Sequence, residues 1–287
     1  MANDYYRYEP SLPAAIIFAV CFSLSAVAHV VQLLKARTWY FIPFLIGCIV
    51  EIVGFLGRAI GAVESPDWTK APYRLQALLL LLGPPFFAAS IYMVFGRLVK
   101  LLDAEKHSLI RTKWVTKFFL FGDIASIFCQ AIEFICGRLH HTGGGKLAGA
   151  ETQSDRNTGQ TIIIVGLAVQ IAFFGFFMAV TVLFHSRINR EPTAISRVLA
   201  TPWRWLLQVL YGASLLIMIR SIFRVIEYVM GEEGALQSNE VYIYVFDALP
   251  MLAVAVAFNF FHPSRITNHT GSNMSAKSDQ ENQLMML

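Results

Sequence analysis

The sequence predicts an all-α, polytopic membrane protein: a bundle of seven transmembrane helices with its N-terminus outside and its C-terminus in the cytosol. Of the 287 residues, 56% are hydrophobic and 15% are charged, against about 25% charged residues in typical globular proteins. The chain also contains seven apolar runs close to the ~20 residues that a membrane-spanning helix needs. Basic residues are divided unevenly between the connections at the two ends of these runs, which indicates the orientation.

The apolar runs are separated by turn-forming or charged stretches and account for most of the length, which leaves no room for a separate soluble domain. We expect an extracellular N-terminus over 1–11, a membrane domain over 12–263 and a cytosolic tail over 264–287. The tail is rich in Ser, Asn and Gln, and this composition predicts disorder. The runs cover residues 12–34, 39–62, 73–99, 115–139, 160–186, 204–230 and 241–262.

The orientation follows from the lysines and arginines near the ends of the helices. One set of connections carries fourteen of them and the other set carries six. Because Lys and Arg accumulate on the cytosolic side, the richer set is cytosolic, and an odd number of helices then places the N-terminus outside. The N-terminal stretch lacks the basic region of a cleavable signal, so we expect the first run to remain as an anchor.

Composition also argues against several classes of protein. The net charge of +4 is modest and gives no case for binding nucleic acid. The four cysteines lie inside apolar runs, which indicates packing rather than a disulfide framework. The chain has no Walker A motif, so we do not expect ATP as a direct energy source, and we expect neither a cofactor nor a bound metal.

Many ionisable and amide side chains fall within the apolar runs. Each charge at membrane depth costs at least ~2.5–3.5 kcal/mol on insertion scales, so such side chains normally face the bundle interior. We expect a polar cavity that opens towards the outer leaflet, with its floor near Glu51 and Asp123. The candidate substrate-binding residues are Glu51, Arg58, Gln76, Asp123, Gln130, Glu133, Gln170, Arg220, Arg224, Glu227 and Asp247.

The charges of this set do not balance. Five of its members are acids and three are arginines, or four if the nearby Arg138 is counted, so pairing leaves one or two acids over. A surplus buried carboxylate is either protonated, because burial disfavours its charged form, or it awaits a cation such as an amine headgroup or a translocated proton. The arginines could equally hold a phosphate, and ion pairs between helices can also serve only packing and register.

Prolines and glycines mark special positions in these helices. Pro84, Pro85 and Pro250 each remove a backbone hydrogen bond within an apolar run, which predicts either hinges or fixed kinks that shape packing. A stripe of Gly47, Gly54 and Gly61 would let a neighbouring helix approach closely. We interpret the phenylalanine-rich stretch over 173–177 as lipid-facing.

Several segments together carry a resemblance to a known family. The longest runs from Leu210 to Asp247 and includes Arg220, Arg224 and Glu227. Shorter ones are Glu51-Ile-Val-Gly-Phe-Leu-Gly-Arg58, Tyr73-Arg-Leu-Gln76, Asp123-Ile-Ala-Ser126 and Gly166-Leu-Ala-Val-Gln170. Over about residues 10–263 the chain resembles the fungal lipid-translocating exporter family, also called RTA-like proteins. Gly83-Pro84-Pro85 and Phe55 depart from the usual family pattern but leave the charged positions unchanged.

The resemblance implies a fungal, non-enzymatic protein of the plasma membrane, although another endomembrane is possible. It implies translocation or export of amphipathic lipids such as sphingoid long-chain bases, and resistance to lipid-like toxins. The partner would be a membrane lipid or an amphipathic small molecule, and a homo-oligomer is possible. The ammonium head of a sphingoid base would suit the surplus acids.

Two other classes remain as alternatives. A seven-helix receptor or lipid and stress sensor without transport activity would share the helix number and the orientation. Against it, the third run lacks Asp-Arg-Tyr at its cytosolic end and the seventh lacks Asn-Pro-x-x-Tyr. An intramembrane hydrolase would need clustered zinc ligands, but only His29 lies well inside an apolar run.

Overall fold

The computed structural model describes residues 8–65, 70–110, 114–128, 153–198, 203–230, 236 and 239–264. Within these ranges the secondary structure is helical. The long helices are α1 (Leu12–Ala36), α2 (Ile42–Val63), α3 (Lys70–Leu101), a helix over 114–128, α5 (Gln153–Arg190), α7 (Trp203–Met230) and α9 (Leu249–Phe260). The short elements are η1 (Trp39–Phe41), η2 (Glu105–His107), α6 (Ala194–Val198), α8 (Glu240–Ile243) and η3 (Tyr244–Ala248).

These elements confirm an all-α, polytopic membrane protein. Six helical segments are long and apolar enough to cross a membrane, and α8, η3 and α9 together form the last of them. The predicted run over 115–139 is helical over 114–128, and its remainder lies outside the described residues. The count of seven helices and the sides of the two termini therefore stay predictions, as does the tail, of which only Ser264 is described.

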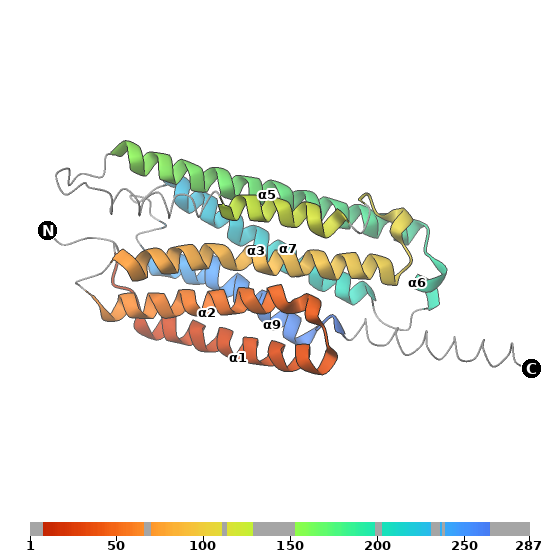
Figure 1. The fold of residues 1–287 in the computed structure, drawn as a ribbon, viewed down its shortest axis with the longest axis horizontal. Coiled ribbons are helices and arrows are strands. Elements are labelled where there is room, and N and C mark those ends of the chain that lie inside the picture. The colour runs from red at the N-terminus through yellow and green to blue at the C-terminus, as the bar shows by residue number, and fades with distance from the viewer. Residues whose placement is uncertain are drawn as a thin grey trace, which may run out of the picture.

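Helices that follow one another in the chain run antiparallel in the bundle (Figure 1). In Figure 1 successive long helices run in alternate directions, so the start of α1 and the end of α9 lie at opposite ends. Large apolar side chains are exposed along the outer faces, as on Ile17, Leu24 and Leu34 of α1. Soluble monomers rarely expose contiguous apolar surfaces of this extent, so these faces are suited to lipid contact and the protein is an integral membrane protein.

Local sequence sets where the first helices begin and end. The Ser11 side chain caps α1 by accepting a hydrogen bond from the backbone N–H of Ala14, and a proline lies in the first turn. Arg37 ends α1 in the left-handed conformation (φ 51°) and donates its backbone N–H to Leu33. After η1, α2 also begins with a proline in its first turn.

The glycines of α2 allow the close approach to α3 that their spacing predicted. A Cβ at Gly47 would lie 2.8 Å from the ring of Phe87, and one at Gly54 would lie 2.9 Å from Leu80. Real Cβ atoms essentially never come so near a neighbour, so the two helices can pack this tightly only because side chains are absent here.

The lipid-facing interpretation of the stretch over 173–177 is wrong for two of its residues. Phe174 and Phe177 are buried, and both pack against Tyr92 of α3. Phe176 is exposed. The four phenylalanines occupy more than one face of a helix, because consecutive residues of an α-helix are about 100° apart, so only part of the stretch can face lipid.

Candidate functional site

A group of ionisable side chains lies in the bundle interior, and we call it the central charge cluster: Arg220, Arg224 and Glu227 of α7, Asp247 of η3 and Glu51 of α2. All five are buried. Asp247 accepts hydrogen bonds from Arg220 Nε and Arg224 Nη2, one on each carboxylate oxygen. Arg224 Nη1 donates to Glu227 Oε2 at 2.9 Å, one helical turn further along α7. Asp247 therefore joins the two arginines that the sequence places on one face.

Arg220 also compensates for the proline pair in α3. Pro84 has no N–H, so the carbonyl of Leu80, four residues earlier, loses its partner within the helix. Arg220 Nη2 donates a hydrogen bond to that carbonyl. Freed backbone groups at membrane depth need such partners. This contact ties the break at Pro84 to the charge cluster.

The position of Asp247 depends on an irregularity in the last membrane span. Residues Tyr244–Ala248 form the π-helix η3, and α9 follows with Pro250 in its first turn. A π-helical turn holds one more residue than an α-helical turn, which shifts the side-chain register, and such turns are frequent at functional sites. The sequence identified Pro250 as a break, and the structure shows the π-helix immediately before it.

Glu51 joins the cluster from α2 and packs against α3. It lies near enough to Arg220, Arg224 and Asp247 to interact with their charges. Its Oε1 is buried and forms no hydrogen bond. A Cβ on Gly83 would overlap Glu51 Oε1 and would come within 2.9 Å of its carboxyl carbon. The absence of a side chain at Gly83 thus makes room for the carboxylate.

We expect Gly83→Ala to lower the free energy of unfolding by about 1–3 kcal/mol, the usual cost of overpacking. Thermal unfolding of the purified protein in detergent measures it, with Gly212→Ala as the control because a Cβ there meets nothing within 4 Å. The three nearest atoms at Gly83 all belong to Glu51. Adding Gly83→Ala to Glu51→Ala should therefore cost little, and a full additional loss would refute the overlap.

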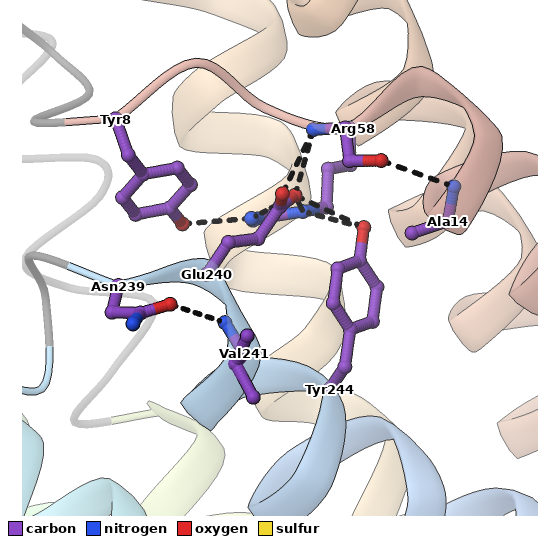
Figure 2. A network of polar contacts seen from close by, with 8 residues as sticks. Tyr8, Ala14, Arg58, Asn239, Glu240, Val241 and Tyr244 are labelled. Atoms are coloured by element: carbon purple, nitrogen blue, oxygen red, sulfur yellow. Dashed lines mark hydrogen bonds and ion pairs between the residues drawn. The ribbon is translucent and has the colours of Figure 1, made fainter.

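A second network, the Arg58 network, surrounds Arg58 of α2 at the end of the bundle where α1 and α8 begin (Figure 2). Arg58 donates to Glu240 Oε1 from Nε at 3.2 Å and from Nη2 at 2.9 Å. It also donates to the hydroxyl oxygens of Tyr8 at 2.7 Å and Tyr244 at 3.2 Å. The backbone N–H of Ser11 donates to both oxygens of Glu240, at 3.0 and 2.9 Å.

This network fastens the segment before α1 to the bundle. The Arg58 guanidinium lies 5.6 Å from the ring centre of Tyr8 and 5.4 Å from that of Tyr244, which adds cation–π attraction. Burial raises the pKa of the Tyr8 phenol above its usual value, so this hydroxyl stays neutral at physiological pH. Arg58 therefore has one charged partner, Glu240, and two neutral ones.

Asp123, on the helix over 114–128, is a buried carboxylate outside the central charge cluster. Neither of its oxygens forms a hydrogen bond of normal geometry, although the hydroxyl of Tyr92 on α3 lies near. Three residues further on, Ser126 donates to the carbonyl of Gly166 at 2.6 Å and lies 3.5 Å from Gln170 Oε1. On α3, Gly83 contacts Glu51 and Tyr92 lies near Asp123. These two α3 residues are nine positions apart, about 2.5 turns, so the two acids lie against opposite faces of α3.

The predicted site residues thus fall into separate groups. Arg58 belongs to the Arg58 network, Gln76 is buried against Gly57 of α2, and Gln170 lies beside Ser126. Gln130 and Glu133 lie outside the described residues. Sequence reasoning did not place Glu240, Tyr8 or Ser11 in the site, because Glu240 lies just before the last apolar run, in the same connection as Glu232 and Glu233. The available signal was that the segment from Leu210 to Asp247, which carries the family resemblance, includes Glu240.

Groups of three or more His, Cys, Asp or Glu residues placed to hold a metal are absent from the part of the chain that the structure describes. What defines this protein is a polytopic helical bundle with one buried and one partly buried ion-pair network, and with two buried carboxylates that make few or no hydrogen bonds. Ionisable side chains inside the membrane commonly mark substrate or ion pathways.

The chain belongs to the RTA1-like protein family, whose model matches residues 44–270. It is 37% identical to Protein RTA1 of Saccharomyces cerevisiae, over 90% of this chain and 85% of that protein. It is 35% identical to Protoporphyrin uptake protein 1 of the same yeast, over 88% of this chain and 90% of that protein. It is 28% identical to the sphingoid long-chain base transporter RSB1 of Saccharomyces cerevisiae, over 90% of this chain and 73% of that protein. No solved structure was found to match the chain.

Proposed function

We propose that this protein translocates amphipathic molecules with a cationic head, with sphingoid long-chain bases as the substrate class, and that it does so in the plasma membrane. Export of such molecules would confer resistance to lipid-like toxins. A relative named as a sphingoid long-chain base transporter supports this proposal. The observation that carries it is the excess of carboxylates over arginines in the central charge cluster.

The cluster contains three carboxylates and two arginines, which gives a net charge of −1 if all five groups are ionised. Asp247 and Glu227 pair with the arginines, and Glu51 is the acid left over. A buried, uncompensated carboxylate is costly, so a bound ammonium group would stabilise it. One ammonium group would bring the cluster to neutrality.

The arginines offer complementary donors to the rest of the headgroup. Arg220 Nη1 and Arg224 Nε are buried and make no hydrogen bond. A sphingoid base carries hydroxyl groups beside its amine, and these can accept hydrogen bonds from the two N–H groups while the ammonium donates to Glu51. The hydrocarbon chain would stay between helices or in lipid.

The test is flux of a fluorescent sphingoid base across proteoliposomes that contain the purified protein. We expect Glu51→Gln to lower the flux about 10- to 100-fold, because a hydrogen bond to a charged group contributes ~1.5–3 kcal/mol. Asp123→Asn tests the second carboxylate separately. Asp103→Asn is the control, because Asp103 is exposed and its left-handed conformation (φ 47°) suits asparagine.

Two results would redirect the proposal. Flux of protoporphyrin without flux of the base would favour an anionic amphiphile as the substrate. Protoporphyrin is the compound in the name of one relative, Protoporphyrin uptake protein 1. The arginines rather than Glu51 would then be the binding groups. No flux of either compound above empty vesicles, with or without a proton gradient, would favour the receptor or sensor.

A further inference from the structure

A groove with a volume of about 250 Å³ lies at the end of the bundle opposite to the Arg58 network. It is lined by Tyr40 of η1, by Met93, Gly96, Arg97 and Lys100 of α3, and by Thr116 of the helix over 114–128. Pockets that hold whole drug-sized molecules usually measure about 300–1,000 Å³. The groove therefore suits a headgroup better than an entire lipid.

The charged side chains that line the groove are positive. Arg97 and Lys100 line it, and within the described ranges neither has an ion-pair partner among the carboxylates. The guanidinium of Arg97 lies 3.8 Å from the ring centre of Tyr40. Stacking on an aromatic face fixes the plane of the guanidinium and leaves its N–H edge free to donate two parallel hydrogen bonds to one phosphate.

The level of the groove in the membrane matches that of lipid phosphates. Exposed tryptophans mark the interface between apolar core and headgroups. Trp39 adjoins Tyr40, Trp114 precedes Thr116 by two residues, and Trp205 lies at the start of α7, at the same end of the bundle; all three are largely exposed. The positive charge pattern assigns this end to the cytosol, where anionic lipids are concentrated.

We propose that this groove binds the phosphate of an anionic ligand, with Arg97 and Lys100 as the cationic contacts and the Thr116 hydroxyl as a further donor. The ligand chemistry is a phosphate monoester, carried by a cytosolic-leaflet lipid or by a soluble phosphate. This site is separate from the central charge cluster and does not depend on the transport proposal. If the phosphate belongs to a lipid, the site would anchor the bundle in the inner leaflet.

The experiment is native mass spectrometry of the purified full chain titrated with phosphatidic acid, with phosphatidylcholine or with inorganic phosphate. We expect phosphatidic acid to bind the wild type more tightly than phosphatidylcholine. Lys100→Gln, an exposed and mild change, should weaken that binding about tenfold, and Arg97→Gln with Lys100→Gln should weaken it further. Lys35→Gln with Arg190→Gln removes two charges at the same end of the bundle, outside the groove, and should leave the binding unchanged.

The titrations distinguish a phosphate carried by a lipid from a soluble phosphate. Displacement of phosphatidic acid by inorganic phosphate at similar concentrations assigns the site to a soluble phosphate, and resistance to that displacement assigns it to the lipid. Both outcomes support the site. Unchanged binding of phosphatidic acid to both groove variants, or an equal loss in the control variant, would overturn it.

Discussion

Asp247→Asn should lower the free energy of unfolding by about 3–5 kcal/mol, the usual cost of breaking a buried ion pair by removing one partner. Asp247 is the shared acceptor of Arg220 and Arg224. An asparagine keeps the shape but has no charge, so both buried guanidinium groups would lose their common counter-ion. Thermal and chemical unfolding of the purified protein in detergent measure the loss.

A matched control and a double variant identify the cause. Asp103→Asn makes the same chemical change at an exposed position and should alter stability by less than about 0.5 kcal/mol. Adding Arg220→Gln to Asp247→Asn should cost much less than the sum of the two single changes, because Asp247 is the carboxylate that Arg220 pairs with and the second change removes the stranded charge. Additive losses would mean that the pair is not coupled as the structure shows.

Arg58→Ala has the second large expected effect, again about 3–5 kcal/mol. It would leave the Glu240 carboxylate without its cation and remove the hydrogen bonds to Tyr8 and Tyr244. Arg58→Lys should recover only part of the loss, since a lysine cannot reproduce the planar set of donors. Arg190→Ala, at an exposed position, should be close to neutral.

Hydrogen exchange gives Arg58→Ala a local signature. The backbone N–H of Ser11 is held by Glu240, and Glu240 is held by Arg58. We expect peptides that include Ser11 to exchange faster in Arg58→Ala, while peptides from the middle of α3 keep their protection. Equal acceleration in both regions would indicate global destabilisation, and the proposed fastening of the first segment would then be rejected.

Sequence reasoning succeeded wherever a local pattern carries the information. The helices α1, α2, α3 and α7 and the last span, Glu240–Phe260, begin and end within about three residues of their apolar runs, and α5 begins seven residues before its run. The agreement arises because the membrane requires a fixed length of apolar residues with internal hydrogen bonds. The close contact at Gly47 and Gly54 followed from their spacing along one face. The pairing of Arg224 with Glu227 is likewise a contact within one turn.

Contacts between distant segments were not predictable in the same way. Arg58 and Glu240 are 182 residues apart, and nothing local distinguishes Glu240 from Glu232 or Glu233 in the same connection. The partner of the Leu80 carbonyl was equally hidden, because a proline reveals which carbonyl is freed but not which side chain from another helix reaches it.

The sequence by itself determined that this protein is a helical membrane bundle, and it determined which polar side chains must face the interior, since both follow from the cost of exposing polar groups to lipid. Only the tertiary structure decided which charges meet. It placed Asp247 between two arginines through a π-helix, paired Arg58 with Glu240, and left Glu51 without a hydrogen bond on Oε1 against Gly83. The physical reason is that ion pairing depends on a few ångströms of distance between helices, which no spacing along a single chain specifies.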